Sequence, residues 1–544
     1  MDTETAAVNP GTTLPSESGA FSLLRSVSWV ESLWYLAVLL LIAGAGVLNL
    51  YRPLHGDTAL FLLGAEAMDR GDLLYVDFWD NKPPGVYVFY YVAGRLFGFT
   101  SFGVHLFELC WMLAFAVVMF AVLRSCLHGR WLSAVPPLVF LTTYWFRSDS
   151  QTLMQVEALV GFPTFVSAWL LTREWSSSGG KFVSCALAGV AAAVAVAFKL
   201  VFAPLFVVFV LVATVEQVRR CRPTARIAFV AGMWAAYTAG VAAVLGAIVL
   251  IFASRGTLDA LLWTTFIYPE LVMPEIAEGL VTAAPFTRLF NSLGWWLGVF
   301  APWLPFAGVG VACCLRHRGS ALLRMMLVWL AGGLGVILLQ RFSWWAYHMT
   351  LLFVPMSVLA ARGLDALLTI LASLGLSARR AVAATVMFLI FPAAAASAAT
   401  AADQFPKVKR VFDGADPKPL RIARYQQNAD EMYLRLAPVA EAIGAPDALA
   451  GDIYVFGNPL IYLFTGRRQA LPVHGWSWEM FVEPLWERLP DDLRDREPVY
   501  IFVDPELRRM IARRSPQVLD FIEARYTAIW SSREGVWYRL QRPT

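Results

Sequence analysis

The residues best suited to catalysis or ligand binding lie in one polar stretch, residues 49–85, directly after the first long hydrophobic run. Asp57 opens a helical pattern there, and Lys82 follows Asp80 in the sequence Asp-Asn-Lys-Pro-Pro-Gly. A carboxylate at the membrane–water boundary can act as a general base on a hydroxyl or amine, because the low-dielectric flank raises its basicity. A lysine near the lipid headgroups suits a phosphate. These residue types therefore favour proton removal beside a bound phosphate.

Each of these residues also has a structural interpretation. Asp57 precedes a periodic apolar run, so it is a candidate helix N-cap. Lys82 is able to snorkel toward water or to form a salt bridge with Asp80. Asp77 and Asp80 have i,i+3 spacing rather than the Asp-x-Asp spacing of a metal-dependent sugar site, so we predict no required metal and no cofactor.

Four more polar residues lie at the ends of apolar runs: Glu157, Lys199, Arg341 and His348. Glu157 is a second candidate acid, or an interfacial helix cap. Lys199 is flanked by apolar residues and needs a partner, either a carboxylate or a lipid phosphate, unless it snorkels. Arg341 and His348 bracket an aromatic segment; arginine binds phosphate well, and the aromatics suit either a sugar face or an interfacial belt.

The composition is that of a membrane protein. Of 544 residues, 58% are hydrophobic and only 15% are charged, with a mean hydropathy of +0.58. A soluble domain has roughly a quarter charged residues. We predict a polytopic α-helical membrane protein with about eleven transmembrane helices, because eleven runs approach the length that crosses a bilayer. The runs are 33–50, 104–123, 131–146, 155–172, 182–198, 200–216, 227–253, 291–315, 321–340, 344–361 and 380–400.

The distribution of basic residues predicts the topology. With a cytoplasmic N-terminus and 84–98 lying as a helix on the outer face, every basic cluster between the runs falls inside. The net charge of +4 is small and its basic residues are spread out, which argues against nucleic acid as a partner. The long loops 51–103 and 255–290 then lie on the outer face of the cytoplasmic membrane. Long loops of this kind are usually functional.

We expect three regions in the chain. Residues 1–30 are a disordered cytoplasmic tail, 31–400 form the transmembrane domain, and 401–544 form an extracytoplasmic α/β domain that begins with a linker at 401–420. Helical periodicity at 421–443 precedes strand-like runs, the last two flanking a hairpin connection. The strand-like runs are 452–456, 499–503, 526–530 and 536–540. The six cysteines are interpreted as small core residues.

The whole layout resembles the GT-C superfamily of polyprenyl-phosphate-sugar-dependent glycosyltransferases. It is most similar to the group of aminoarabinose transferases, protein O-mannosyltransferase-like enzymes and rhizobial core-sugar transferases. The resemblance covers roughly residues 30–365 and the soluble tail. The segments that carry it are Gly56-Asp57-Thr58, Asp80-Asn-Lys82-Pro-Pro-Gly85, Val-Glu157-Ala, Phe-Lys199, the segment from Arg341 to His348, and Val455-Phe-Gly-Asn-Pro459.

This resemblance implies a sugar donor on polyprenyl phosphate and an extracytoplasmic glycolipid, cell-wall glycan or protein as acceptor. Asp57 matches the first-loop acid that deprotonates or orients the acceptor, and Lys82 matches the lysine near the donor phosphate. Glu157 matches a second outer-loop acid. The residues expected to help hold phosphate or sugar are Asp80, Lys199, Arg341 and His348. The chain departs from the pattern at Thr58, where many relatives have an acid, and at Met349, where they have an aromatic.

Two other classes of function remain as alternatives. A lipid or glycan transporter or flippase would place ionisable residues in mid-membrane and would show paired repeats, whereas these charges gather at one set of helix ends. A membrane-anchored envelope assembly protein would tolerate replacement of Asp57 and Lys82. Our preferred hypothesis is a membrane glycosyltransferase with Asp57 as base and Lys82 at the donor phosphate.

Overall fold

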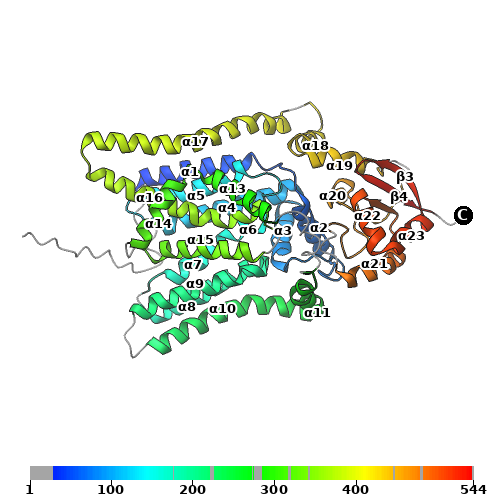
Figure 1. Cartoon of the computed structure of the whole chain (residues 1–544), viewed down its shortest axis with the longest axis horizontal. Coiled ribbons are helices and arrows are strands. Elements are labelled where there is room, and N and C mark those ends of the chain that lie inside the picture. The colour runs from blue at the N-terminus through cyan, green and yellow to red at the C-terminus, as the bar shows by residue number, and fades with distance from the viewer. Residues whose placement is uncertain are drawn as a thin grey trace, which may run out of the picture.

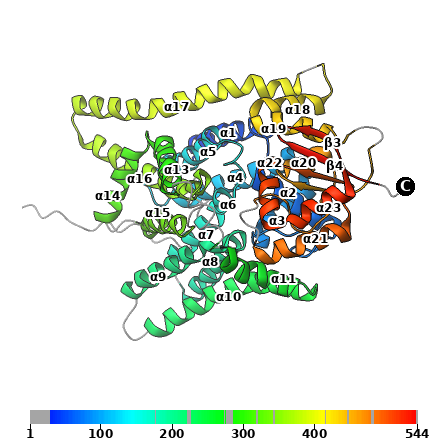
Figure 2. The ribbon, with the colours of Figure 1, turned by 45° about the vertical axis from the view of Figure 1, so that its right-hand side comes forward.

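The computed structural model describes residues 28–175, 177–220, 226–272, 274, 285–316, 320–340, 344–413, 415–444, 448–477 and 482–541. Most helices run along the long axis of the molecule, and a small mixed domain covers one end of the resulting bundle (Figure 1). Helices α2 and α3 lie between the bundle and this domain (Figure 1), and the domain overlaps them in the turned view (Figure 2). The predicted tail at 1–30 lies outside the described residues except for its last three, and the first helix already begins at Trp29.

The bundle is built from helices that coincide with the eleven predicted runs. Their bounds are α1 (Trp29–Val47), α4 (Ser101–Leu123), α5 (Val135–Arg147), α6 (Val156–Leu159), α7 (Gly161–Thr172), α8 (Ser178–Phe198), α9 (Ala203–Arg220), α10 (Arg226–Ser254), α13 (Pro285–Phe300), α14 (Leu304–Arg316), α15 (Ala321–Leu339), α16 (Phe353–Ser373) and α17 (Leu376–Phe412).

Fewer of these helices than predicted are long and apolar enough to cross a membrane by themselves. In the described part of the chain seven meet that criterion, or eight if the α13–α14 pair, bent by 92°, counts as one span. The run at 155–172 is divided between α6 and α7, and α5 has only 13 residues. A helix of 13 residues is about 20 Å long at 1.5 Å per residue, short of a hydrocarbon core about 30 Å thick.

Glycines let pairs of bundle helices pack backbone to backbone. A β-carbon on Gly189 of α8 would lie 2.1 Å from the Tyr237 carbonyl oxygen of α10, and one on Gly240 of α10 would lie 1.9 Å from the Ala186 carbonyl oxygen. Larger side chains at these positions would therefore separate the two helices. Small residues at such contacts are the usual way in which membrane helices associate.

Two helices precede the bundle's second spanning helix at the end near the small domain. They are α2 (Gly56–Arg70) and α3 (Pro84–Phe97), which pack on each other. The predicted helix at 84–98 is thus confirmed as a helix, and its 14 residues pack against α4 and α8 as well. The carboxylates of Glu66 and Asp69 lie on α2, as expected of a connecting helix with one polar face.

The prediction of a linker at 401–420 is wrong for most of its length. Helix α17 continues without interruption to Phe412 and therefore crosses the predicted domain boundary at 401. Pro392 and Pro406 lie within this helix. The helix persists because Val408 and Val411 are buried, so its last turns have a packed apolar side.

The C-terminal domain is a four-stranded sheet covered by helices, and all four predicted strands are confirmed. The strand order is β1-β2-β4-β3, with β1 and β2 parallel and the other neighbours antiparallel. The strands are β1 (Ile453–Phe456), β2 (Tyr500–Val503), β3 (Tyr526–Ser532) and β4 (Gly535–Leu540). The helices are α18 (Lys418–Ala429), α19 (Glu431–Glu441), α20 (Leu460–Thr465), α21 (Glu483–Arg496), α22 (Pro505–Arg514) and α23 (Pro516–Arg525).

Candidate active site

Lys199 is the centre of a polar cluster at the end of α8. Its backbone is extended between α8 and a short 3-10 helix, Leu200–Phe202. The ammonium group donates hydrogen bonds to Glu157 Oε1 at 2.7 Å and to Gln340 Oε1 at 2.5 Å. The Nε2 atom of His348 lies 3.4 Å from the ammonium and 3.6 Å from Glu157 Oε1. Three predicted site residues from distant parts of the chain therefore meet here.

This cluster is largely buried. The side chains of Glu157 and His348 are 1% exposed, whereas that of Lys199 is 20% exposed. A buried carboxylate needs a paired cation because isolated charges are strongly disfavoured in a low-dielectric interior. Lys199 supplies that cation and keeps part of its surface open to a ligand. The snorkelling alternative for Lys199 is thus wrong.

A hydrogen-bonded chain positions the segment that carries Glu157. Met154 has a left-handed backbone (φ 62°), a conformation that costs a residue of this kind about 1–3 kcal/mol. Its N–H donates to the Tyr144 hydroxyl at 2.8 Å, and its carbonyl accepts from the Tyr90 hydroxyl at 3.2 Å. The Tyr144 hydroxyl donates in turn to the buried carboxylate of Glu108. These contacts hold the backbone turn just before Glu157.

Asp57 lies in the first turn of α2, but it does not cap that helix. The N-cap is His55, whose N–H donates to the Thr58 hydroxyl at 2.8 Å while that hydroxyl donates back to the His55 carbonyl at 2.8 Å. The N-cap interpretation of Asp57 is therefore wrong. Asp57 is half-buried, and its side chain forms no hydrogen bond or ion pair with any residue that the structure describes. Its carboxylate remains available to a ligand.

Lys82 lies at the start of α3, directly before the two prolines. Its ammonium donates to the Asn81 side-chain oxygen at 3.0 Å and forms no ion pair within the described part of the chain, so the predicted alternative of a salt bridge to Asp80 is wrong. A β-carbon on Gly85 would lie 2.6 Å from the Ala197 carbonyl oxygen, so α3 begins in direct contact with the end of α8. This contact brings Lys82 near the Lys199 cluster.

The charges around Lys82 come from three predicted site residues. Burial lowers the pKa of the Lys82 ammonium, but the carboxylates of Asp57, Asp80 and Glu157 outweigh this effect and raise that pKa above its ordinary value. Lys82 therefore stays protonated at neutral pH. The same interactions indicate that the carboxylates of both polar segments surround one space near this ammonium.

Asp80 is committed to contacts within the protein. It accepts a hydrogen bond from the Tyr87 hydroxyl at 2.5 Å, and His474 Nε2 of the C-terminal domain lies 3.6 Å from its other oxygen. Burial opposes ionisation of Asp80, but Lys82, His474 and Tyr87 outweigh it and hold its pKa well below the ordinary value. Its geometry suits the positioning of Lys82 and of the C-terminal domain better than direct contact with a donor.

The C-terminal domain closes one side of this region through the segment 472–476. The Trp79 N–H donates to the Pro472 carbonyl at 2.8 Å, and the Trp79 ring stacks on His474. Trp476 packs on Gly56, where a β-carbon would lie 2.2 Å from the indole ring. The sequence analysis missed these residues and Gln340. The clustering of Pro, His, Gly and Trp at 472–476 was the available signal, but nothing in the sequence joined it to residue 79.

Two predictions are less well defined by the structure. Arg341 lies outside the described residues. No group of three His, Cys, Asp or Glu side chains with metal-site geometry occurs in the ranges that the structure describes, and the absence of a metal stays a prediction.

A cavity of about 560 Å³ lies next to the His348 segment. It is lined by Gln151 of the turn before α6, by Arg288 and Asn291 of α13, and by Trp345. The Arg288 guanidinium lies 4.2 Å from the centre of the Trp345 ring. An arginine stacked on an aromatic ring offers both a charge and a flat surface to a ligand.

Comparison with solved structures identifies the architecture. The chain is similar to ArnT from Cupriavidus metallidurans bound to undecaprenyl phosphate, with a TM-score of 0.55 at 14% identity over 94% of this chain and 98% of that one. The apo form of the same protein gives 0.54 at 15% identity, over 93% and 97% of the two chains. The chain therefore shares the fold of ArnT. No protein-family model and no curated protein sequence matches this one.

The shared fold confirms the predicted class, a polytopic helical membrane protein with a small α/β domain. In this fold α2 packs against α20 of the C-terminal domain, and the segment before α3 contacts the domain through Trp79 and Asp80, all at one end of the bundle (Figure 2). All the described site residues lie at that end. The fold therefore brings them together, while their roles rest on the local chemistry.

Proposed function

We propose that this protein is a membrane glycosyltransferase that moves a sugar from a polyprenyl-phosphate donor to an acceptor on the outer side of the membrane. The proposal rests on the position of Asp57. Its carboxylate is unpaired among the described residues, and it lies close enough to Lys82 to raise the pKa of the Lys82 ammonium. A base and a phosphate-binding cation in one site are what glycosyl transfer from a lipid phosphate requires. The undecaprenyl phosphate in the ArnT structure, which shares this fold, supports the class of donor.

In the proposed reaction, Asp57 accepts the proton of an acceptor hydroxyl or amine as that group attacks the anomeric carbon. The attack comes from the face opposite the phosphate, so the configuration at that carbon inverts. The bond between the anomeric carbon and the phosphate oxygen breaks, and its electron pair stays on that oxygen. Lys82 stabilises the negative charge that develops on the leaving phosphate.

The Lys199 cluster is the second part of the proposed site. Glu157 and His348 fix the Lys199 ammonium in one position, so it is preorganised for phosphate or for a sugar hydroxyl. A preorganised charge in a site of low dielectric costs no reorganisation at the moment of reaction. We therefore assign Glu157 as the residue that orients Lys199, and not as a second base.

The arrangement of charges supports the proposed orientation. The site residues gather at one end of the helices, whereas the arginine clusters lie between the opposite ends, where the positive-inside rule expects them. The protein is then an inner-membrane enzyme whose site and C-terminal domain face outward. A transporter would instead place these groups near the middle of the helices.

The test is transfer of a labelled sugar from polyprenyl-phosphate donors by the purified full chain in lipid nanodiscs. Asp57→Asn should lower transfer by about 10²–10⁴-fold, the usual contribution of general acid–base catalysis, without a change in melting temperature. Asp69→Asn, on the same helix, is the matched control and should keep full activity. Full activity of Asp57→Asn would remove Asp57 from its role, and no turnover with any such donor would reject the class.

A further inference from the structure

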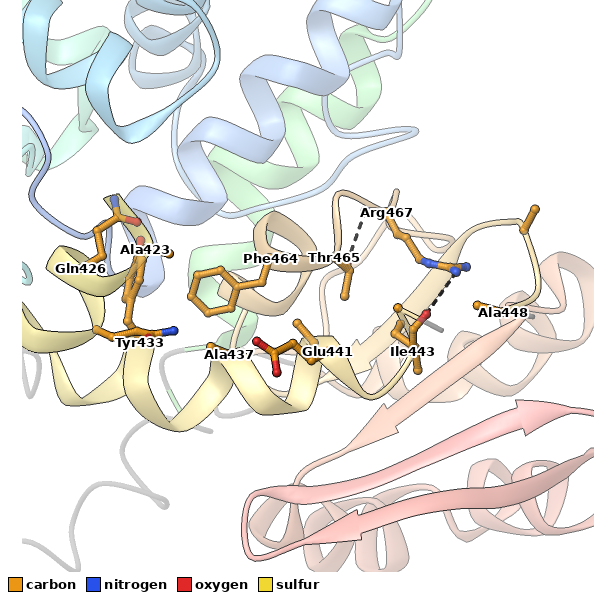
Figure 3. A pocket seen from close by; sticks show the side chains of 14 residues that line it. Ala423, Gln426, Tyr433, Ala437, Glu441, Ile443, Ala448, Phe464, Thr465 and Arg467 are labelled. Carbon is orange, nitrogen blue, oxygen red and sulfur yellow. Dashed lines mark hydrogen bonds between the residues drawn. The ribbon is translucent and has the colours of Figure 1, made fainter. Parts of the chain in front are cut away.

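The C-terminal domain contains a second cavity, of about 600 Å³, which the proposed catalytic steps do not use (Figure 3). It lies between α18, α19 and α20. Tyr433 and Phe464 form its aromatic wall, with their rings edge to face and 4.8 Å between centroids. Its size is within the about 300–1,000 Å³ that small-molecule sites occupy.

The free polar groups in this cavity are a carboxylate and an amide. The side chains of Glu441 and Gln427 line it and form no hydrogen bond or ion pair with residues in the described ranges. Arg467 at the rim is already engaged, since it donates to the Leu449 carbonyl at 2.6 Å and its guanidinium stacks on the Tyr500 ring. The guanidinium of Arg467 is therefore occupied by contacts within the protein. The side chains of Glu441 and Gln427 remain able to accept and donate hydrogen bonds to a ligand.

These groups match a neutral carbohydrate better than a peptide or an anion. Sugar hydroxyls donate well to a carboxylate, and the faces of sugar rings pack on aromatic side chains. The carboxylate of Glu441 repels phosphate and acidic groups. Peptide sites instead use a free sheet edge, a long apolar groove or a cluster of free cations. The walls of this cavity are three helices and the segment after α19, and its arginine is occupied.

The cavity is joined directly to the helix that carries Asp57. The Leu54 N–H donates to the Tyr433 hydroxyl at 2.8 Å, three residues before Asp57 in the chain. Helix α20, which provides Phe464, packs against α2. A ligand that contacts Tyr433 and Phe464 therefore lies beside the elements that position the candidate base.

We propose that this cavity binds the neutral oligosaccharide portion of a glycan-bearing acceptor and holds it next to α2. The inference rests on the proposed function, because it names the class of acceptor for the same enzyme. It makes the C-terminal domain a determinant of acceptor specificity, distinct from the donor-binding charges of Lys82 and Lys199.

Binding is tested without turnover. The full chain carrying Asp57→Asn, in nanodiscs, is screened with short neutral oligosaccharides by saturation-transfer NMR. At least one should bind, and Glu441→Gln and Phe464→Ala should each weaken it by about tenfold, as expected for loss of a hydrogen bond to a charged group or of an aromatic contact. Glu487→Gln, an exposed carboxylate on α21, is the control and should bind normally. Absence of binding, or equal binding by all variants, would overturn the inference.

Kinetics separate this inference from the proposed function. Where the wild type transfers sugar, Glu441→Gln should raise the KM for a glycan acceptor about tenfold and leave kcat and the KM for the donor unchanged. Glu441 is exposed, so this variant keeps its fold. Transfer with an unchanged acceptor KM would reject the cavity and keep the enzyme. Glycan binding that depends on Glu441 without any transfer would reject the enzyme and keep the cavity.

Discussion

The two ends of the helix bundle both contain acidic and basic groups but use them in different ways. At the end far from the C-terminal domain, carboxylates are paired with arginine. Arg324 holds both oxygens of Glu216, each at 2.9 Å. Two further arginine–carboxylate pairs of this end are Arg124 with Glu31 at 3.3 Å and Arg362 with Asp365 at 3.0 Å.

Within the candidate site, at the end near the C-terminal domain, the cations are lysines. The Arg70–Asp72 and Arg95–Asp69 pairs of the same end lie outside the site, at the more exposed C-terminal ends of α2 and α3. Lys199 contacts one oxygen of Glu157, and Lys82 contacts only an amide oxygen. The planar arginine fork satisfies a carboxylate completely, whereas a lysine ammonium is a point charge that can still bind a phosphate. The comparison indicates that the first end is closed for stability and topology, and that the second retains unsatisfied charge for a ligand.

The largest effect is expected at Lys199. Lys199→Met should destabilise the protein by about 3 kcal/mol, because breaking a buried pair leaves an uncompensated charge on Glu157. It should also lower transfer strongly. Thermal unfolding of the double variant Lys199→Met/Glu157→Gln separates the two effects, since it should recover most of the stability but none of the activity. Recovery of both would make Lys199 a purely structural residue.

Lys82→Met should act on the reaction more strongly than on the fold. Loss of one preorganised donor for developing charge typically costs about 10²–10³-fold in kcat. Lys82 has no direct ion pair in the described part of the chain, and Asp80 keeps its contacts with Tyr87 and His474, so the melting temperature should fall less than for Lys199→Met. Steady-state transfer and thermal unfolding on the same preparations check both statements. A large loss of stability with normal kcat would contradict them.

The pH profile sharpens the role of Lys82. Its raised pKa keeps the ammonium charged past the ordinary lysine value of about 10.4. The KM for the donor should therefore stay constant from neutral to about pH 10 and rise only above it. Asp80→Asn removes one of the carboxylates that raise this pKa, so the rise should begin at lower pH. The contribution of Lys82 to the free energy of unfolding follows the same direction of pH. It is complete below the pKa of this lysine in the unfolded chain and is lost as the pH rises through its pKa in the folded protein.

The smallest effect is expected at the far end. Arg324→Gln should lower stability by about 1 kcal/mol or less, as for other partly exposed ion pairs, and leave transfer unchanged. Transfer and melting temperature are measured beside those of Lys199→Met. A loss of activity comparable to that of Lys199→Met would show that the two ends are not functionally distinct.

Local sequence patterns predicted much of this fold. The eleven apolar runs coincide with helices, and the four strands lie where alternation and turn residues indicated. Two errors have the same cause. The linker at 401–420 and the N-cap at Asp57 were inferred from local preferences, whereas buried valines extend α17 and the His55–Thr58 pair caps α2.

The sequence by itself determined the class of protein, the list of polar residues at membrane-helix ends and the resemblance to GT-C enzymes. Composition and residue type carry that information because each charge near a membrane is costly and therefore rare. Only the tertiary structure decided which charges neutralise each other. Glu157, Lys199, Gln340 and His348 meet although up to 149 residues separate the ammonium from its partners, and His474 reaches Asp80 from another domain. The structure also left Asp57 unpaired, which no local pattern could indicate.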